Sequence, residues 1–172
     1  YLRAELMRVT YVTDAEGRVR LQEPYAGPAD SAVLPGAGEA LRSGRPAATG
    51  LVNGPNGPAV FLFVPFRDWT GQAAGLVAGE IDPRGPRVAA VLAEHSARSS
   101  GGSIDVIDSA GVILASTDQA RQGAASDHRQ LLASLIRTGG STRGTCHSCH
   151  EGSERRTTDL MAFASSRSLG WG

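Results

Sequence analysis

The sequence predicts an α+β fold built on antiparallel sheets, because short β-branched segments joined by tight turns alternate with a few amphipathic helical stretches. Val9–Val12 and residues 18–21 flank the turn residues 14–17, which is typical of a β-hairpin. A second hairpin is expected over 104–115, around a turn at 108–111. With 41% hydrophobic and 20% charged residues, the 172-residue chain has the balance of one or two small globular domains.

The second hairpin repeats the turn chemistry of the first, with Asp14 matched by Asp108. Asp and Gly are common in turns, so this match alone is weak. The order of elements after each hairpin also repeats. The sequence therefore predicts two PAS-like modules, over 1–84 and 85–172, each an antiparallel sheet with flanking helices.

Each predicted module has its own series of further elements. The first has an N-terminal helix over 2–7, a helical turn over 39–42, and strands over 60–66 and 74–81. The second has a helix over 86–98 that starts with Pro in its first turn, a helix from an N-cap at Ser126 to Gly139, and a strand over 160–164. Residues 142–158 are polar and have no regular apolar pattern, which predicts a loop.

Charge and hydropathy exclude two classes of partner. All 17 basic residues are Arg and balance 17 acidic residues, and no basic stripe indicates a nucleic-acid surface. The longest strongly apolar run, Ala59–Phe66, is far shorter than the roughly 20 residues of a membrane-spanning helix. Any membrane contact is therefore expected through segments outside this chain.

The chain's two cysteines lie in the segment Cys146-His147-Ser148-Cys149-His150. The pattern C-x-x-C-H is the attachment motif of c-type haem, in which the two thiols add across the two vinyl groups. His150 is then placed as an axial ligand of the iron. The sequence predicts one covalent haem c held by Cys146, Cys149 and His150, in the loop over 142–158.

Three other interpretations of the motif remain open. A redox-active dithiol also uses C-x-x-C, although that fold has the motif early, at a strand-to-helix junction. A zinc site could use Cys146, Cys149 and His150, but it normally needs a second pair of ligands. The segment could also be an inert loop or form an adventitious disulfide.

The sixth iron ligand is less well defined by the sequence. His128 lies on a predicted apolar helix face, and Met161 lies on the strand that follows the haem loop, so both are candidates. Met7 could reach a haem of a partner chain. His95 is expected to pack on its own helix, and His147 is badly placed between the two cysteines. An open coordination position is an equal alternative.

A second candidate site follows the predicted strand over 60–66. Arg67 and Trp69 could clamp a small anion or a planar ligand. A solvated turn with a packed indole is the alternative interpretation.

Several segments together resemble the double Cache (dCache) sensor domains of bacterial transmembrane receptors. The matching segments are 12–19, 61–66 with 71–79, 106–117 and 169–172. The resemblance implies a periplasmic sensing region with a membrane-distal module followed by a membrane-proximal one, and commonly a homodimer. The Arg-and-Trp/Tyr pattern with which some members bind amino acids is not evident near 39–50, and most members have no haem motif.

The combined expectation is a periplasmic, non-enzymatic sensor domain of an inner-membrane chemotaxis receptor or histidine kinase. Its haem would detect redox state or a small gas. Two alternatives are an electron-transfer c-type cytochrome and a dCache module that binds a small organic ligand in its distal pocket.

Overall fold

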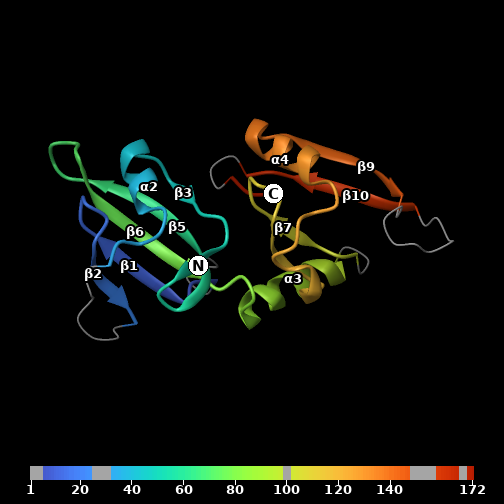
Figure 1. Ribbon diagram of the computed structural model, residues 1–172, viewed down its shortest axis with the longest axis horizontal. Coiled ribbons are helices and arrows are strands. Elements are labelled where there is room, and N and C mark those ends of the chain that lie inside the picture. The colour runs from blue at the N-terminus through green and yellow to red at the C-terminus, as the bar shows by residue number, and fades with distance from the viewer. Residues whose placement is uncertain (1–5, 25–31, 99–101, 148–157, 167–169) are drawn as a thin grey trace.

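A computed structural model of the chain describes residues 6–24, 32–98, 102–147, 158–166 and 170–172, with the backbone alone for 146–147 and 158–160. Figure 1 shows two groups of elements, with helix α3 (Pro86–Arg98) below the second group. The first group contains β1 (Val9–Thr13), β2 (Val19–Glu23), α2 (Ala37–Ser43), β3 (Ala47–Ala48), β4 (Val52–Gly54), β5 (Gly57–Arg67) and β6 (Ala73–Ile81). The second contains β7 (Asp105–Ile107), β8 (Ile113–Ser116), the 3-10 helix η1 (Gln119–Arg121), α4 (Arg129–Thr138), β9 (Ser141–His147) and β10 (Thr158–Ala164).

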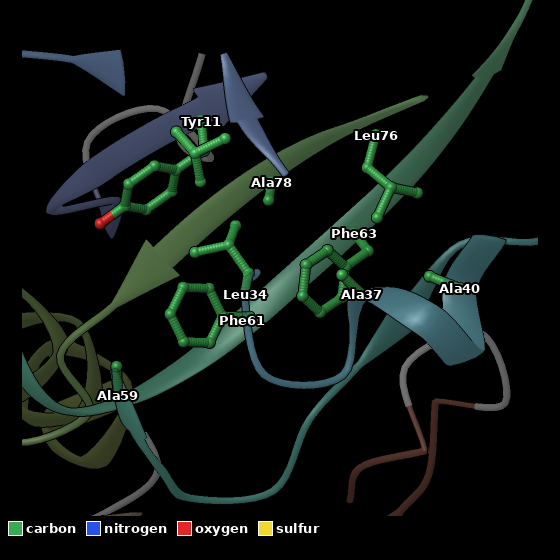
Figure 2. Close-up of a cluster of buried hydrophobic side chains, with 10 residues drawn as sticks. Tyr11, Leu34, Ala37, Ala40, Ala59, Phe61, Phe63, Leu76 and Ala78 are labelled. Atoms are coloured by element: carbon green, nitrogen blue, oxygen red, sulfur yellow. The ribbon is translucent and has the colours of Figure 1, made fainter. Parts of the chain in front are cut away.

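The first group forms a six-stranded antiparallel sheet in the order β2-β1-β6-β5-β3, with β4 paired to β5. Phe61 and Phe63 are two residues apart on β5, so they share the face that is covered by α2. Their rings stack with centroids 5.9 Å apart. The small side chains of Ala37 and Ala40 let α2 approach these rings closely (Figure 2).

The second group contains two small antiparallel sheets, β7–β8 and β9–β10. Its core is formed by Ile107, Ile113, Leu132 and Ile136, and Phe163 of β10 packs against them. α4 supplies two of these side chains because they are four residues apart on one helix face. The structure thus confirms a mainly antiparallel α+β fold. The division into two modules after residue 84 stays a prediction.

Three turns in the described chain have the same hydrogen-bonding pattern. Asp14, Asp68 and Asp108 each accept bonds through Oδ1 from the backbone N–H groups two and four residues later, at 2.8–3.0 Å. A glycine with positive φ, between 73° and 86°, follows three residues after each Asp. Because the turn at Asp68 joins β5 to β6, this motif marks tight hairpins in general. The match of Asp14 to Asp108 is therefore weaker support for a duplicated module than the sequence suggested.

Most of the predicted elements are confirmed, with corrections at their ends. The helix over 86–98 is confirmed as α3. α4 begins at Arg129 with His128 at its N-cap, so the predicted N-cap at Ser126 is wrong. Of the helix over 2–7, only Leu6 and Met7 lie within the described residues. Within the described part of the chain, no helix has the length and apolar character to span a bilayer.

The predicted loop over 142–158 is wrong at both ends. Residues 142–147 belong to β9 and Thr158 begins β10, and the two strands pair without a register shift from Thr158↔His147 to Ala164↔Ser141. The polar composition concealed these strands because a two-stranded ribbon exposes much of its surface and does not require an apolar alternation. Residues 148–157 lie outside the described residues.

Candidate functional site

A buried polar cluster lies at one end of the first sheet. Glu80 of β6 has 0% exposed surface. Its Oε1 accepts a bond from Nε of Arg8 at 3.1 Å and a second, shorter one from Nη2. Its Oε2 accepts from the Tyr11 hydroxyl at 2.5 Å and from the Asn56 amide at 3.0 Å. Both carboxylate oxygens are thus satisfied, which a buried charge requires.

Three elements meet at this cluster. Arg8 lies just before β1, Glu80 lies near the end of β6, and Asn56 lies in the turn between β4 and β5. Arg8 also donates its backbone N–H to the carbonyl of Glu80 at 2.7 Å, and its Nη1 lies 3.7 Å from Oδ2 of Asp82. The cluster therefore fixes the start of the sheet to the segment that leads into α3.

Burial raises the pKa of the Tyr11 hydroxyl strongly, and the hydrogen bond to Glu80 and its negative charge act in the same direction. A tyrosinate at this position would repel the carboxylate and lose most of its hydration. Tyr11 is therefore a neutral hydrogen-bond donor at physiological pH.

The described chain has a hollow beside the Glu80 cluster and another in the second group of elements. The first, called the α3 hollow, has a volume of about 290 Å³ and is lined by Leu6, Met7, Arg8, Asp82, Gly85, Pro86 and Arg87. The second, called the α4 hollow, has a volume of about 500 Å³ and is lined by Ser109, Ile136, Arg137, Thr138 and Gly170. Both combine an apolar surface with at least one arginine, which is the composition of many small-molecule sites.

Arg67 and Trp69 lie at the turn between β5 and β6, and their role as a clamp for a ligand stays a prediction. Trp69 is 95% exposed at the turn between β5 and β6. Arg67 donates from Nη1 to the carbonyl of Gly71 at 2.7 Å, which closes the same turn. The turn is thus exposed to solvent, and the indole is not packed as the alternative interpretation expected.

The candidate sixth ligands lie on different elements. His128 is half-buried at the N-cap of α4, and Leu131, expected on its apolar face, is 51% exposed. Met161 lies on β10, and its backbone is paired with Gly144. Met7 packs over Gly79, with its sulfur 2.5 Å from where a Cβ would stand there. His95 is exposed on α3 and not packed as expected.

The haem motif is only partly within the described residues. The backbone of Cys146 pairs with Asp159 at the end of β9, and His147 pairs with Thr158. Cys149 and His150 lie outside the described residues. In the part of the chain that the structure describes, no three His, Cys, Asp or Glu side chains gather into a metal-binding group. The assignment of Cys146, Cys149 and His150 to haem stays a prediction from the motif.

Sequence reasoning missed the Glu80 cluster, although a signal was present. Glu80 is the charged residue within the otherwise uncharged segment Ala73–Ile81. An acidic residue in a strand that is buried on both faces needs a partner, since glutamate is almost never buried unpaired. The partners come from Arg8, Tyr11 and Asn56, which are distant in the sequence, so their identity required the fold.

Comparisons with known proteins find similarity at the level of the fold. No family model and no curated protein matches the sequence. The chain is similar to the extracellular ligand binding receptor from Desulfohalobium retbaense DSM5692, with a TM-score of 0.63 and 14% identity over 83% of this chain and 26% of that one. It is also similar to the ligand-binding domain of the Pseudomonas fluorescens chemoreceptor CtaA in complex with L-leucine (TM-score 0.58, 18% identity, 91% of this chain and 63% of that one).

A third similar structure is the ligand-binding domain of the amino acid chemoreceptor PctC of Pseudomonas aeruginosa PAO1 in complex with GABA. Its TM-score is 0.51 at 18% identity, over 92% of this chain and 74% of that one. The chain thus spans 26% of the Desulfohalobium protein and 63% of the CtaA domain. At these identities the similarity shows a shared fold, that of extracellular ligand-binding domains.

Proposed function

We propose that this chain is the extracytoplasmic sensor domain of a transmembrane receptor and that it binds a small organic ligand. The observation that carries the proposal is the fold, which is similar over 83–92% of the chain to ligand-binding domains of receptors. A fold alone does not determine the ligand, so the ligand class is argued from the chain's own residues. The proposal assigns no catalytic step to this domain.

The α4 hollow is the proposed ligand site. The space between α2 and the first sheet is filled by Leu34, Phe61 and Phe63, which are at most 1% exposed, and this argues against a distal pocket. The α4 hollow, at about 500 Å³, lies within the usual range of roughly 300–1,000 Å³ for ligand sites. Arg137 offers a planar pair of donors and Ser109 a hydroxyl, which suits a small molecule that carries a carboxylate.

A thermal-shift screen of small carboxylates, amino acids included, tests this function. A ligand at 100 times its Kd should stabilise the domain by about 2.7 kcal/mol, because it binds the folded state alone. Arg137→Gln should weaken binding at least about tenfold through loss of charged hydrogen bonds. Arg143→Gln on the exposed surface of β9 is the matched control and should bind as the parent does. Binding that is unchanged in Arg137→Gln would rule out the α4 hollow.

A second proposal is that the chain carries one haem c, which the spacing of Cys146, Cys149 and His150 supports. The two thiols would hold the group and His150 would be an axial ligand. Such a group would supply an iron centre that responds to redox state or to a small gas. The β9–β10 ribbon would support the haem, because the motif starts where these two strands pair.

Expression with haem-maturation machinery, followed by a pyridine haemochrome assay, tests the second proposal. One haem per chain should remain bound after denaturation, and Cys146→Ser with Cys149→Ser should abolish it. His150→Ala should retain the attachment but change the spin state of the iron. The absence of covalent haem in the parent chain would refute the proposal and leave the small-ligand function untouched.

A further inference from the structure

The last described residues, Trp171 and Gly172, are held by the second group of elements. Gly172 exchanges two backbone hydrogen bonds with Ile107 of β7, Ile107 N–H to Gly172 at 2.7 Å and Gly172 N–H to Ile107 at 3.0 Å. Trp171 forms bridges to Asp108 and to Ser166. This short C-terminal segment therefore lies as an added strand along the edge of β7.

The side chain of Trp171 reaches the first group of elements. Its Nε1 donates to the carbonyl of Thr49, between β3 and β4, at 3.2 Å. Thr49 in turn is bonded twice to Phe61: its N–H donates to the Phe61 carbonyl at 3.0 Å, and its hydroxyl accepts from the Phe61 N–H at 3.0 Å. Phe61 is fully buried in the first core, so a chain of direct contacts joins that core to the C-terminal strand.

Thr49 also packs closely against the start of α2. Its Cγ2 lies 2.7 Å from where a Cβ on Gly36, the N-cap of α2, would stand. A shift of α2 relative to the sheet therefore displaces Thr49 directly. Because protein interiors are densely packed, such a displacement is passed to the residues in contact.

A second contact lies beside the first. A Cβ on Gly50 would stand 2.6 Å from Oδ2 of Asp108, so these two residues are in close approach. Asp108 is buried, and its other oxygen holds the turn that joins β7 to β8. Thr49 and Gly50 thus contact Trp171 and Asp108, two residues that are themselves bridged.

We infer that this four-residue contact, called the Thr49–Trp171 contact, couples the packing of the first core to the pairing of the C-terminal strand with β7. The coupling is a property of the fold, and its role in signalling rests on the proposed sensor function. The indole contributes in two ways, as a donor to a fixed carbonyl and as a rigid bridge between the two groups. Loosening the first core should therefore loosen the pairing of Ile107 with Gly172.

Amide hydrogen exchange measured by NMR on the whole domain without any ligand tests the coupling. Phe61→Leu loosens the first core and should speed exchange of the Ile107 amide about fivefold. A fivefold change corresponds to about 1 kcal/mol, which is what one ordinary hydrogen bond contributes. In the Trp171→Phe chain, which lacks the donor, Phe61→Leu should have almost no effect on Ile107.

The chain's other tryptophan supplies the matched control. Trp69 is 95% exposed, so in the Trp69→Phe chain Phe61→Leu should act on Ile107 as it does in the parent. An equal response of Ile107 in the Trp171→Phe chain and the parent would overturn the inference. No ligand is needed, so a failed ligand screen and a failed coupling are separate results.

A second variant keeps the test decisive if Phe61→Leu unfolds the domain. Gly50→Ala places a methyl group against Asp108 and should shift the amide resonances of Ala110 and Val112, which donate to that carboxylate, together with that of Ile107. Gly38→Ala on α2, where the nearest atom to the new methyl is the end of Arg42 at 3.5 Å, is its control. No change in these resonances on Gly50→Ala would also overturn the inference.

Discussion

Glu80 shows how a single residue can tie distant parts of a sheet together. A carboxylate removed from water is stable only when its oxygens are bonded and its charge is balanced. Arg8 balances the charge and can still reach solvent, since its side chain is 30% exposed. Tyr11 and Asn56 occupy the remaining positions. The ion pair therefore joins the residue just before β1 to the end of β6.

At the residue scale, the raised pKa of Tyr11 predicts a loss of stability at alkaline pH. The pKa is higher in the folded state than in the unfolded state, where it is about 10. The stabilisation is complete below pH 10 and is lost as pH rises through the folded-state pKa. The free energy of unfolding should fall by up to about 1.4 kcal/mol per pH unit above pH 10.

Tyr11→Phe should remove this part of the decrease in the free energy of unfolding with pH. At pH 7 the same substitution should lower the free energy of unfolding by about 1 kcal/mol, because the hydrogen bond to Glu80 is lost. Urea unfolding of both chains from pH 8 to 11 measures the difference. Parallel profiles for the two chains would show that Tyr11 is not the titrating group.

At the scale of elements, sequence patterns predicted some parts of the fold well and others poorly, for physical reasons. α3 was predicted correctly because its signals, Pro86 in the first turn and a single apolar face, lie within the helix itself. β9 was missed because Thr142, Arg143 and Gly144 have no strand pattern, and only pairing with β10 makes them a strand. The lining of the α4 hollow comes from three segments that no local signal relates.

An element-scale prediction concerns the pairing of β1 with β6. Gly75 has a φ of 158°, and a Cβ there would lie 2.0 Å from the carbonyl oxygen of Thr13. Gly75→Ala should therefore force the strands apart and lower the free energy of unfolding by about 1–3 kcal/mol. Gly144→Ala on β9, where no atom lies within 4 Å of the new methyl, should change it by less than about 0.5 kcal/mol. Equal effects in urea unfolding would contradict the crowding at Gly75.

At the scale of the whole molecule, two separate hydrophobic cores are formed by the elements that precede and the elements that follow α3 in the chain. The first has Phe61 and Phe63 under α2, whereas the second is smaller and is built on aliphatic side chains of α4, β7 and β8. The groups are joined through the hydrogen bond from Trp171 to Thr49 and the close approach of Gly50 to Asp108. A mutation in one core should therefore lower the local stability of that core most. The Thr49–Trp171 contact should pass a smaller part of the effect to the other core.

Leu132→Ala tests this separation. Truncation of a buried leucine leaves a cavity and should cost about 2–5 kcal/mol of local stability in the second core. Hydrogen exchange should accelerate strongly in α4 and β8 and only weakly in β5 and β6. Equal acceleration in all four elements would indicate a single cooperative unit.

The uninterrupted register of β9 with β10 has a consequence for where the cysteine motif begins. Seven backbone pairs, from Ala164↔Ser141 to Thr158↔His147, join the hairpin at its base, where Phe163 is anchored in the second core. The backbone of Cys146, paired with Asp159, therefore lies at a fixed position along this ribbon relative to the second core. The ribbon acts as a rigid arm, which sets where the cysteine motif begins.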